Sequence, residues 1–193
     1  MNPEPIQFRS EFERVITDSP IGVELREAAL AGKLGSWTRH LTAACVGACE
    51  AGGLCASAKG HKLDLLPVSR SEYLGLDVVA FRAEGRKWRF PALIAELENQ
   101  RDFDFIAYSL WKVLSVRAGL RIVFCYRKEA GMAGELVRRL KTEVIDALGL
   151  NARLNLEGET LVVVGTRSEG GTFPYGFFSW WRLNVGTGVF NPL

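Results

Sequence analysis

Three acidic residues interrupt two apolar segments in the middle of the chain. Asp77 lies in YLGLDVVAF (residues 73–81), and Glu96 and Glu98 lie in FPALIAELE (residues 90–98). Both segments have the composition of β-strands, in which an ionised carboxylate is costly unless it is paired or binds a metal ion. Clustered carboxylates also repel one another, and a divalent cation would relieve that repulsion. We therefore treat the three acids as candidate metal-binding and catalytic residues.

The connector between the two apolar segments indicates how the acids are brought together. RAEGRKWR is polar and has a glycine near its middle, which is typical of a β-hairpin. Because side chains alternate along a strand, Glu96 and Glu98 share one face. A turn at Gly85–Arg86 would place Asp77 opposite Ile94 and diagonal to Glu96, and a slip of two residues would place it opposite Glu96. Either register brings the carboxylates close enough to bridge one cation.

This order of residues and elements resembles the PD-(D/E)XK nuclease superfamily, whose fold includes the type II restriction enzymes. The family core is a helix, three strands, a helix and a further strand, with metal-binding acids on the second and third strands. The resemblance covers residues 36–127 and depends on Asp77 followed by Glu96-Leu97-Glu98. Glu98 stands where the family usually has lysine, which is similar to the Glu-x-Glu variant of some restriction enzymes. The implied fold class is α/β, with a restriction-endonuclease-like core extended by a C-terminal helix and strands.

The resemblance also implies a role for each residue. Asp77, Glu96 and the backbone carbonyl of Leu97 would bind the metal, for which Mg²⁺ is the first choice and Mn²⁺ the second. The metal would lower the pKa of a bound water, which Glu98 would orient or deprotonate. The family lysine sometimes lies instead on the following helix, which makes Lys112 a fourth catalytic candidate. The competing interpretation is that Lys112 is an ordinary solvated helix lysine.

Basic residues near the acids in sequence would contact the phosphates of a nucleic acid. They are Arg82, Arg86, Lys87 and Arg89 on the predicted hairpin, and Arg101 after its second strand. The solubility of an exposed hairpin explains them nearly as well. The resulting hypothesis is a Mg²⁺-dependent endonuclease, a hydrolase of phosphodiester bonds, with DNA favoured over RNA as the substrate.

Two other functions are compatible with the same residues. A catalytically inactive member of the same fold would bind nucleic acid or a protein, and the missing family lysine favours that alternative. An interaction protein could also carry these acids on an uncovered face of its sheet. Retention of all three acids at metal-binding spacing argues against a mere scaffold.

The remaining segments predict a single domain spanning residues 1–193. It comprises an N-terminal helical extension (1–35), the core (36–127) and a C-terminal helix with strands (128–193). Helices are expected at 21–33, at 37–51 after a Ser36 cap, at 105–118 after an Asp104 cap, and at 131–150. Strands are expected at 61–69, 120–127, 159–166 and in the aromatic segment 175–184, which could also form a homodimer surface.

The composition is typical of a globular protein. The chain has 193 residues, of which 48% are hydrophobic and 24% charged, as in an ordinary globular domain. A formal net charge of +2 is too small to indicate nucleic-acid binding by itself. The first residues lack an apolar signal region and no apolar segment has the length of a membrane span, so we expect a cytoplasmic protein that does not enter membranes.

Cysteines and helix glutamates offer two weaker metal hypotheses. Cys45, Cys49 and Cys55 lie near His40 and His61, which are zinc or iron–sulfur ligand types, but no Cys-x-x-Cys pair occurs. Buried packing of these cysteines as small hydrophobic residues is the favoured interpretation.

Members of the resembled family often recruit a helix glutamate to the metal. Glu24, Glu27 and Glu50 are the candidates here. Solvent-facing glutamates are the more common outcome.

Overall fold

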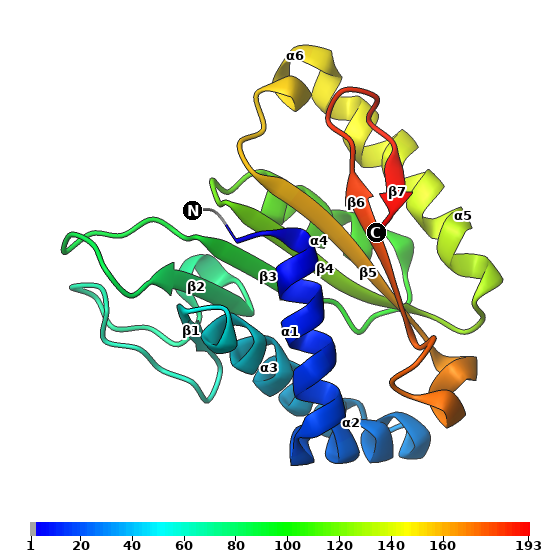
Figure 1. Cartoon of the computed structure of the whole chain (residues 1–193). Helices are drawn as coiled ribbons and strands as arrows, with labels where there is room; N and C mark the ends of the chain where they lie inside the picture. Colours follow the sequence, from blue (N-terminus) through cyan, green and yellow to red (C-terminus); the bar gives the residue numbers. More distant parts are fainter. Residues whose placement is uncertain (1–2) are drawn as a thin grey trace.

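The computed structural model describes residues 3–193, which form helices packed on both sides of one seven-stranded sheet (Figure 1). The strands follow one another across the sheet in chain order. They are β1 (Leu54–Ala58), β2 (Val78–Arg82), β3 (Leu93–Leu97), β4 (Leu120–Arg127), β5 (Glu159–Thr166), β6 (Phe178–Leu183) and β7 (Phe190–Pro192). β1, β2 and β3 form an antiparallel meander, β3, β4 and β5 are parallel, and β6 and β7 return antiparallel. The fold is therefore mixed α/β with a mostly antiparallel sheet.

Two hydrophobic clusters cover the two faces of the sheet. The helices α1 (Pro5–Asp18), α2 (Pro20–Ala31) and α3 (Leu34–Ala51) supply one cluster, and α4 (Phe103–Leu114) and α5 (Gly131–Leu140) supply the other. Neighbouring residues of β4 divide between the clusters, since Phe124 packs with Phe12 of α1 and Val123 packs with α4 and α5. This alternation is the period-two pattern expected of a strand that is buried on both faces.

The sequence predicts the middle of the sheet correctly. β4 and β5 occupy the predicted ranges 120–127 and 159–166, because continuous runs of apolar residues mark strands covered on both faces. α4 connects β3 to β4, and the two strands pair in parallel as expected for a crossover through a helix.

The first strand of the meander is not where the sequence placed it. The strand is β1, made of LCASA, whereas residues 61–69 contain no strand and only isolated bridges at His61 and Leu63. Gly60, with φ +85°, turns the chain back so that His61 pairs with Ala58. The small side chains of β1 gave no strand signal, because strand propensity depends on β-branched and aromatic residues.

Several predicted boundaries are also corrected. α4 begins two residues early and is capped by Asp102, whose carboxylate accepts a hydrogen bond from the Asp104 amide at 2.9 Å. α3 begins at Leu34, so Ser36 lies inside the helix and does not cap it. Residues 73–75 form a 3₁₀ turn and not the start of β2, because Leu74 and Gly75 both have positive φ angles.

The predicted helix at 131–150 is divided. α5 ends at Leu140 and passes through a π turn (Lys141–Ile145) and a 3₁₀ turn (Asp146–Leu148) into the short α6 (Gly149–Leu154). Gly149 adopts φ 69°, a backbone conformation that interrupts a regular helix.

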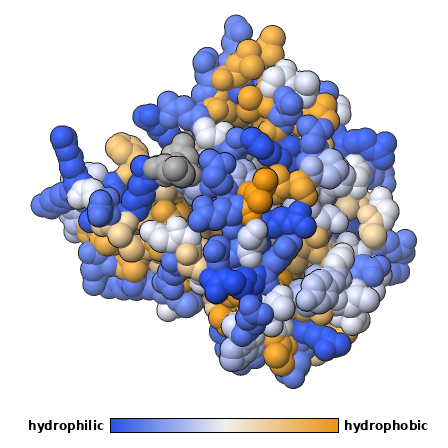
Figure 2. All heavy atoms as spheres, in the orientation of Figure 1, coloured by the Kyte–Doolittle hydropathy of each residue, from blue (hydrophilic) through white to orange (hydrophobic). Residues whose placement is uncertain are grey.

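The surface alternates between hydrophilic and smaller hydrophobic areas (Figure 2). One hydrophobic area lies over α6, where Leu150 and Leu154 are exposed. No helix in residues 3–193 combines the length and apolar character needed to cross a membrane.

Candidate active site

Asp77 and Glu96 lie across from each other where β2 and β3 meet. The ladder pairs Val79 with Ile94 and Val78 with Ala95, so continuing it by one residue sets Asp77 against Glu96. The register with Asp77 opposite Ile94 is therefore wrong, and the register slipped by two residues is correct. The pairing between the two strands ends at Ala80 and Leu93. The connector between these two residues is therefore longer than a tight hairpin turn at Gly85–Arg86.

Asp77 also ends the ladder between the two strands. Its Oδ2 accepts a hydrogen bond of 2.7 Å from the backbone amide of Leu97. The carboxylate thus takes the place that a backbone carbonyl of β2 would occupy in a longer ladder. The side chain of Leu97 is buried in the cluster beneath α1 and α3, which fixes this end of β3.

Glu96 is buried and paired with the lysine of the neighbouring helix. Lys112 Nζ lies 2.9 Å from Glu96 Oε1, with the two side chains 23% and 10% exposed, and it also donates to the Gly75 carbonyl. Burial raises the pKa of Glu96 and the nearby Asp77 charge adds to that effect, while the hydrogen bond from Lys112 opposes it. Lys112 is therefore held at the acids and is not a freely solvated helix lysine.

Glu98 follows Glu96 on the same side of the strand but has its own partners. Its Oε1 accepts from the Gln100 amide at 2.7 Å, and its Oε2 accepts from Ser109 Oγ of α4 at 3.4 Å. Ser109 and Lys112 lie one helical turn apart, so one face of α4 holds both glutamates.

The three acids are not arranged as three ligands of one metal ion. Within the described part of the chain, no group of three or more His, Cys, Asp or Glu side chains is arranged to hold a metal ion. Asp77 and Glu96, the second of which is also paired with Lys112, supply two carboxylates, and Mg²⁺ in proteins commonly takes only one or two carboxylates and keeps several waters.

The other proposed metal ligands lie elsewhere. Cys45 and Cys49 are buried in the core under α3, where burial raises the pKa of both thiols. Glu24 binds His40 Nδ1 at 2.9 Å, and Glu50 is exposed at the far end of α3. Exposed Glu27 forms no ion pair with a basic group in residues 3–193.

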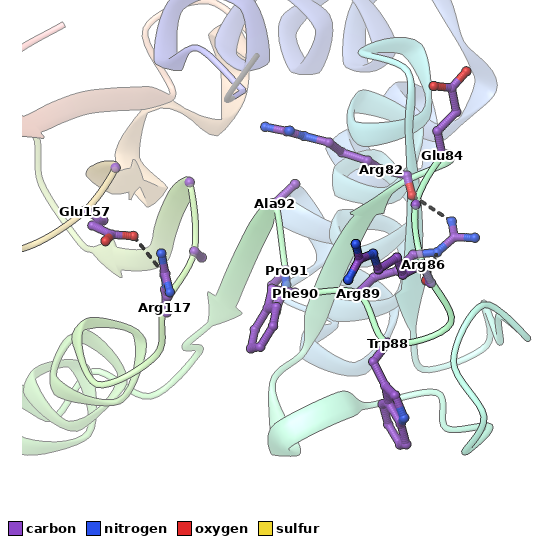
Figure 3. A pocket seen from close by; sticks show the side chains of 14 residues that line it. Arg82, Glu84, Arg86, Trp88, Arg89, Phe90, Pro91, Ala92, Arg117 and Glu157 are labelled. Carbon is purple, nitrogen blue, oxygen red and sulfur yellow. Dashed lines mark hydrogen bonds and ion pairs between the residues drawn. The ribbon is translucent and has the colours of Figure 1, made fainter.

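Four of the predicted basic residues lie at the opposite end of the hairpin from the acids. Arg82 follows Asp77 by five strand residues, which corresponds to roughly 17 Å at the rise of a β-strand. Arg82, Arg86 and Arg89 line a cleft of about 530 Å³ between the hairpin tip and the loops before β4 and β5 (Figure 3). The expectation that they flank the acids is therefore wrong, because the connector extends away from the site.

Four basic residues lie at the carboxyl ends of the three parallel strands, the edge of the sheet at which Glu98 follows β3. Arg101 follows β3, Arg127 is the last residue of β4 and Lys128 follows it, and Arg167 follows β5. Arg127 donates to the Arg101 carbonyl at 3.3 Å, and burial together with the Arg101 charge lowers the pKa of Arg167. None of the four forms an ion pair with an acid in the described residues. Of these four residues only Arg101 was expected from the sequence, although the carboxyl ends of parallel strands gather at one edge of a sheet, a rule that indicates the other three as well.

We compared the chain with family models, with curated proteins and with solved structures, and none of them matches it.

Proposed function

We propose that this protein is a metal-dependent nuclease that hydrolyses phosphodiester bonds, with DNA as the expected substrate. The observation that carries the proposal is the group formed by Asp77, Glu96 and Lys112. Asp77 and Glu96 occupy opposed positions next to the paired segments of β2 and β3, the charge of Asp77 acts on Glu96, and a lysine from the crossover helix is bonded to Glu96. This is the arrangement that the resemblance to PD-(D/E)XK nucleases implies when the lysine has moved to the helix.

The order of elements supports the same proposal. α3, the meander of β1, β2 and β3, the crossover helix α4 and the parallel strand β4 follow the helix–three strands–helix–strand order of a restriction-endonuclease-like core. Asp77 directly precedes the second of these strands and Glu96 lies in the third, which is close to the placement of the acids in that family.

Each side chain of the site would have its own role in the reaction. Asp77, Glu96 and the Leu97 carbonyl would hold Mg²⁺, and the bound ion would polarise the scissile phosphate and lower the pKa of a water molecule. Lys112 fixes Glu96 and supplies a positive charge beside it, which would stabilise charge on the phosphate. Glu98, held by Ser109 and the Gln100 amide, would orient the attacking water or accept its proton.

Arginines at the carboxyl ends of the parallel strands would position the substrate. Arg101, Arg127 and Arg167 lie together without acidic partners among the described residues, and guanidinium groups bind phosphates with good geometry. They would hold phosphates adjacent to the one that is cleaved.

An inactive binding protein of the same fold is the second candidate. It is favoured by the ion pair between Lys112 and Glu96, which could serve structure alone, and by the missing third acid in the part of the chain that is described. Such a protein would bind nucleic acid without cleaving it.

The deciding experiment incubates plasmid, single-stranded DNA and RNA with the protein in Mg²⁺, Mn²⁺, Ca²⁺ or chelator. We expect cleavage with Mg²⁺ or Mn²⁺, none in chelator, and little with Ca²⁺, which coordinates more loosely. The control is Asp77→Asn prepared in the same way. Equal cleavage by parent and variant would exclude this site, whereas binding without cleavage of any substrate would favour the inactive module.

A further inference from the structure

The cleft at the tip of the β2–β3 hairpin lies far from the acids and carries a different set of side chains. Trp88 and Phe90 line it and are 64% and 78% exposed. Three arginines of the hairpin line the same wall of the cleft, and Arg117 lies on the opposite wall (Figure 3). Large aromatic rings displayed beside guanidinium groups form a recurring combination in proteins that bind single-stranded nucleic acid.

The hairpin wall of this cleft is fixed by Arg89. Its guanidinium turns back onto the connector and donates to the carbonyls of Arg82 at 2.8 Å and of Ala83 at 2.5 Å, and its Nε donates to Arg86 at 3.3 Å. Trp88 and Phe90 lie on either side of Arg89 in the chain, and both rings point to the same side of the hairpin in Figure 3. The arginine is therefore occupied in holding the loop, while the two rings remain available for contact.

The opposite wall is equally constrained. Buried Arg121 donates to the Val116 carbonyl at 3.0 Å and to the Glu157 carbonyl at 2.7 Å, which ties the loops before β4 and β5 together. Gly158 has φ +79°, and a Cβ there would come within 2.3 Å of the Gly119 carbonyl oxygen, so the two loops pack backbone to backbone. The cleft is consequently formed in advance and does not depend on a partner for its shape.

The charges around the cleft favour an anionic partner. Four arginines line it against two glutamates, and the positive excess remains when Arg117 and Glu157, which pair with each other at 2.8 Å, are both set aside. Exposed aromatic faces would otherwise be costly to leave in water, and a flat, anionic ligand matches both features. A volume of about 530 Å³ accommodates a ligand with the size of a nucleotide.

We propose that this cleft binds a segment of single-stranded nucleic acid, with bases stacked on Trp88 and Phe90 and phosphates held by Arg86. The proposal deepens the nuclease function and rests on it, because it assigns to the enzyme a substrate with an unpaired strand. A strand bound there would be anchored at a distance from the scissile phosphate, at the other end of the same two β-strands.

Binding is tested in chelator, where cleavage does not occur, by the fluorescence anisotropy of short labelled single-stranded DNA and RNA. We expect Trp88→Ala combined with Phe90→Ala to weaken binding about tenfold or more, and Arg86→Gln to weaken it less. Tyr175→Ala, which removes another exposed aromatic ring outside the cleft, is the matched control and should bind like the parent. Circular dichroism of each variant verifies the fold.

Three results would overturn the proposal. These are failure of the parent to bind either strand, equal binding by the double variant, and displacement of the strand by a nucleoside monophosphate at comparable concentration, which would indicate a mononucleotide site. Binding to anionic vesicles that is lost in the double variant, without strand binding, would instead identify a membrane surface. Asp77→Asn should bind like the parent, so failure of the cleft and failure of the nuclease function are distinguished.

Discussion

The two ends of the β2–β3 hairpin place their functional candidates in opposite environments. At one end, Glu96 is buried and bonded to Lys112, and Asp77 is fixed on the Leu97 amide. At the other end, Trp88 and Phe90 are exposed, and the charged groups face solvent. Side chains that are buried and held by hydrogen bonds are suited to catalysis, which needs defined geometry. Exposed side chains are suited to binding a flexible ligand. The same pair of strands can therefore carry both tasks.

The largest expected effect of a single substitution is on the cleavage rate, at the end of the hairpin that carries Asp77 and Glu96. Asp77→Asn should lower the rate of Mg²⁺-dependent cleavage by at least about a hundredfold, because an amide is a poor ligand for a hard dication. The asparagine carbonyl can still accept the Leu97 amide, so the melting temperature should remain close to that of the parent. Initial rates on a supercoiled plasmid and thermal melts measure the two quantities. A variant that retains its activity would show that the chemistry lies elsewhere.

The second effect concerns stability. Lys112→Ala should reduce the free energy of unfolding by about 1–3 kcal/mol, since buried Glu96 and the Gly75 carbonyl both lose a donor. Arg86→Ala, the matched loss of an exposed basic residue at the tip, should change it by less than about 0.5 kcal/mol. Urea denaturation of the three proteins makes the comparison. An equal loss of unfolding free energy in the two variants would show that Lys112 supports the fold no more than an exposed basic residue does.

The pH dependence of stability provides a third test. Burial raises the pKa of Glu96 above its ordinary value of 4.5, so the folded state holds this proton more tightly than the unfolded state does. The stability contributed by protonated Glu96 is fully present below that value and is lost as the pH rises through the folded-state pKa. Glu96→Gln removes this dependence, so its stability relative to the parent should increase as the pH is raised from 4.5 towards neutrality. Urea denaturation across that range would detect the trend, and a parallel pH profile for the two proteins would refute it.

The smallest expected effect is at the hairpin tip, where Trp88 and Phe90 are exposed. Trp88→Ala and Phe90→Ala should each change the free energy of unfolding by no more than about 0.5 kcal/mol, because neither ring packs in a core cluster. Calorimetric melts of the single variants measure this. A loss of several degrees would mean that the rings support the fold and are not reserved for a ligand.

The sequence predicted the elements that carry long apolar runs and failed where weak local signals decide the structure. β4 and β5 were found because burial on both faces leaves an unmistakable pattern. β1 was missed because its alanines and serine resemble a loop, and its place in the sheet depends on pairing with β2.

The candidate site shows the same division. Alternation identified Glu96 and Glu98, and the register set Asp77 against Glu96 as one of two alternatives. The separate partners of Glu98, and the distance of the hairpin arginines from the acids, depend on where the connector folds and on the packing of α4. Neither is encoded in the spacing of the acids.

The two outer strands of the sheet bear on how copies of this protein could associate. β7 has three residues and contains Pro192, which has no amide hydrogen to donate. Beside β1, the chain folds back at His61, and Ser57 Oγ donates to the carbonyls of Arg70 and Ser71 at 3.0 Å. Short, proline-containing or covered edges resist the addition of a strand from another molecule. A homodimer would therefore have to form through side-chain surfaces and not by continuing the sheet, and the protein should resist edge-to-edge aggregation into fibrils.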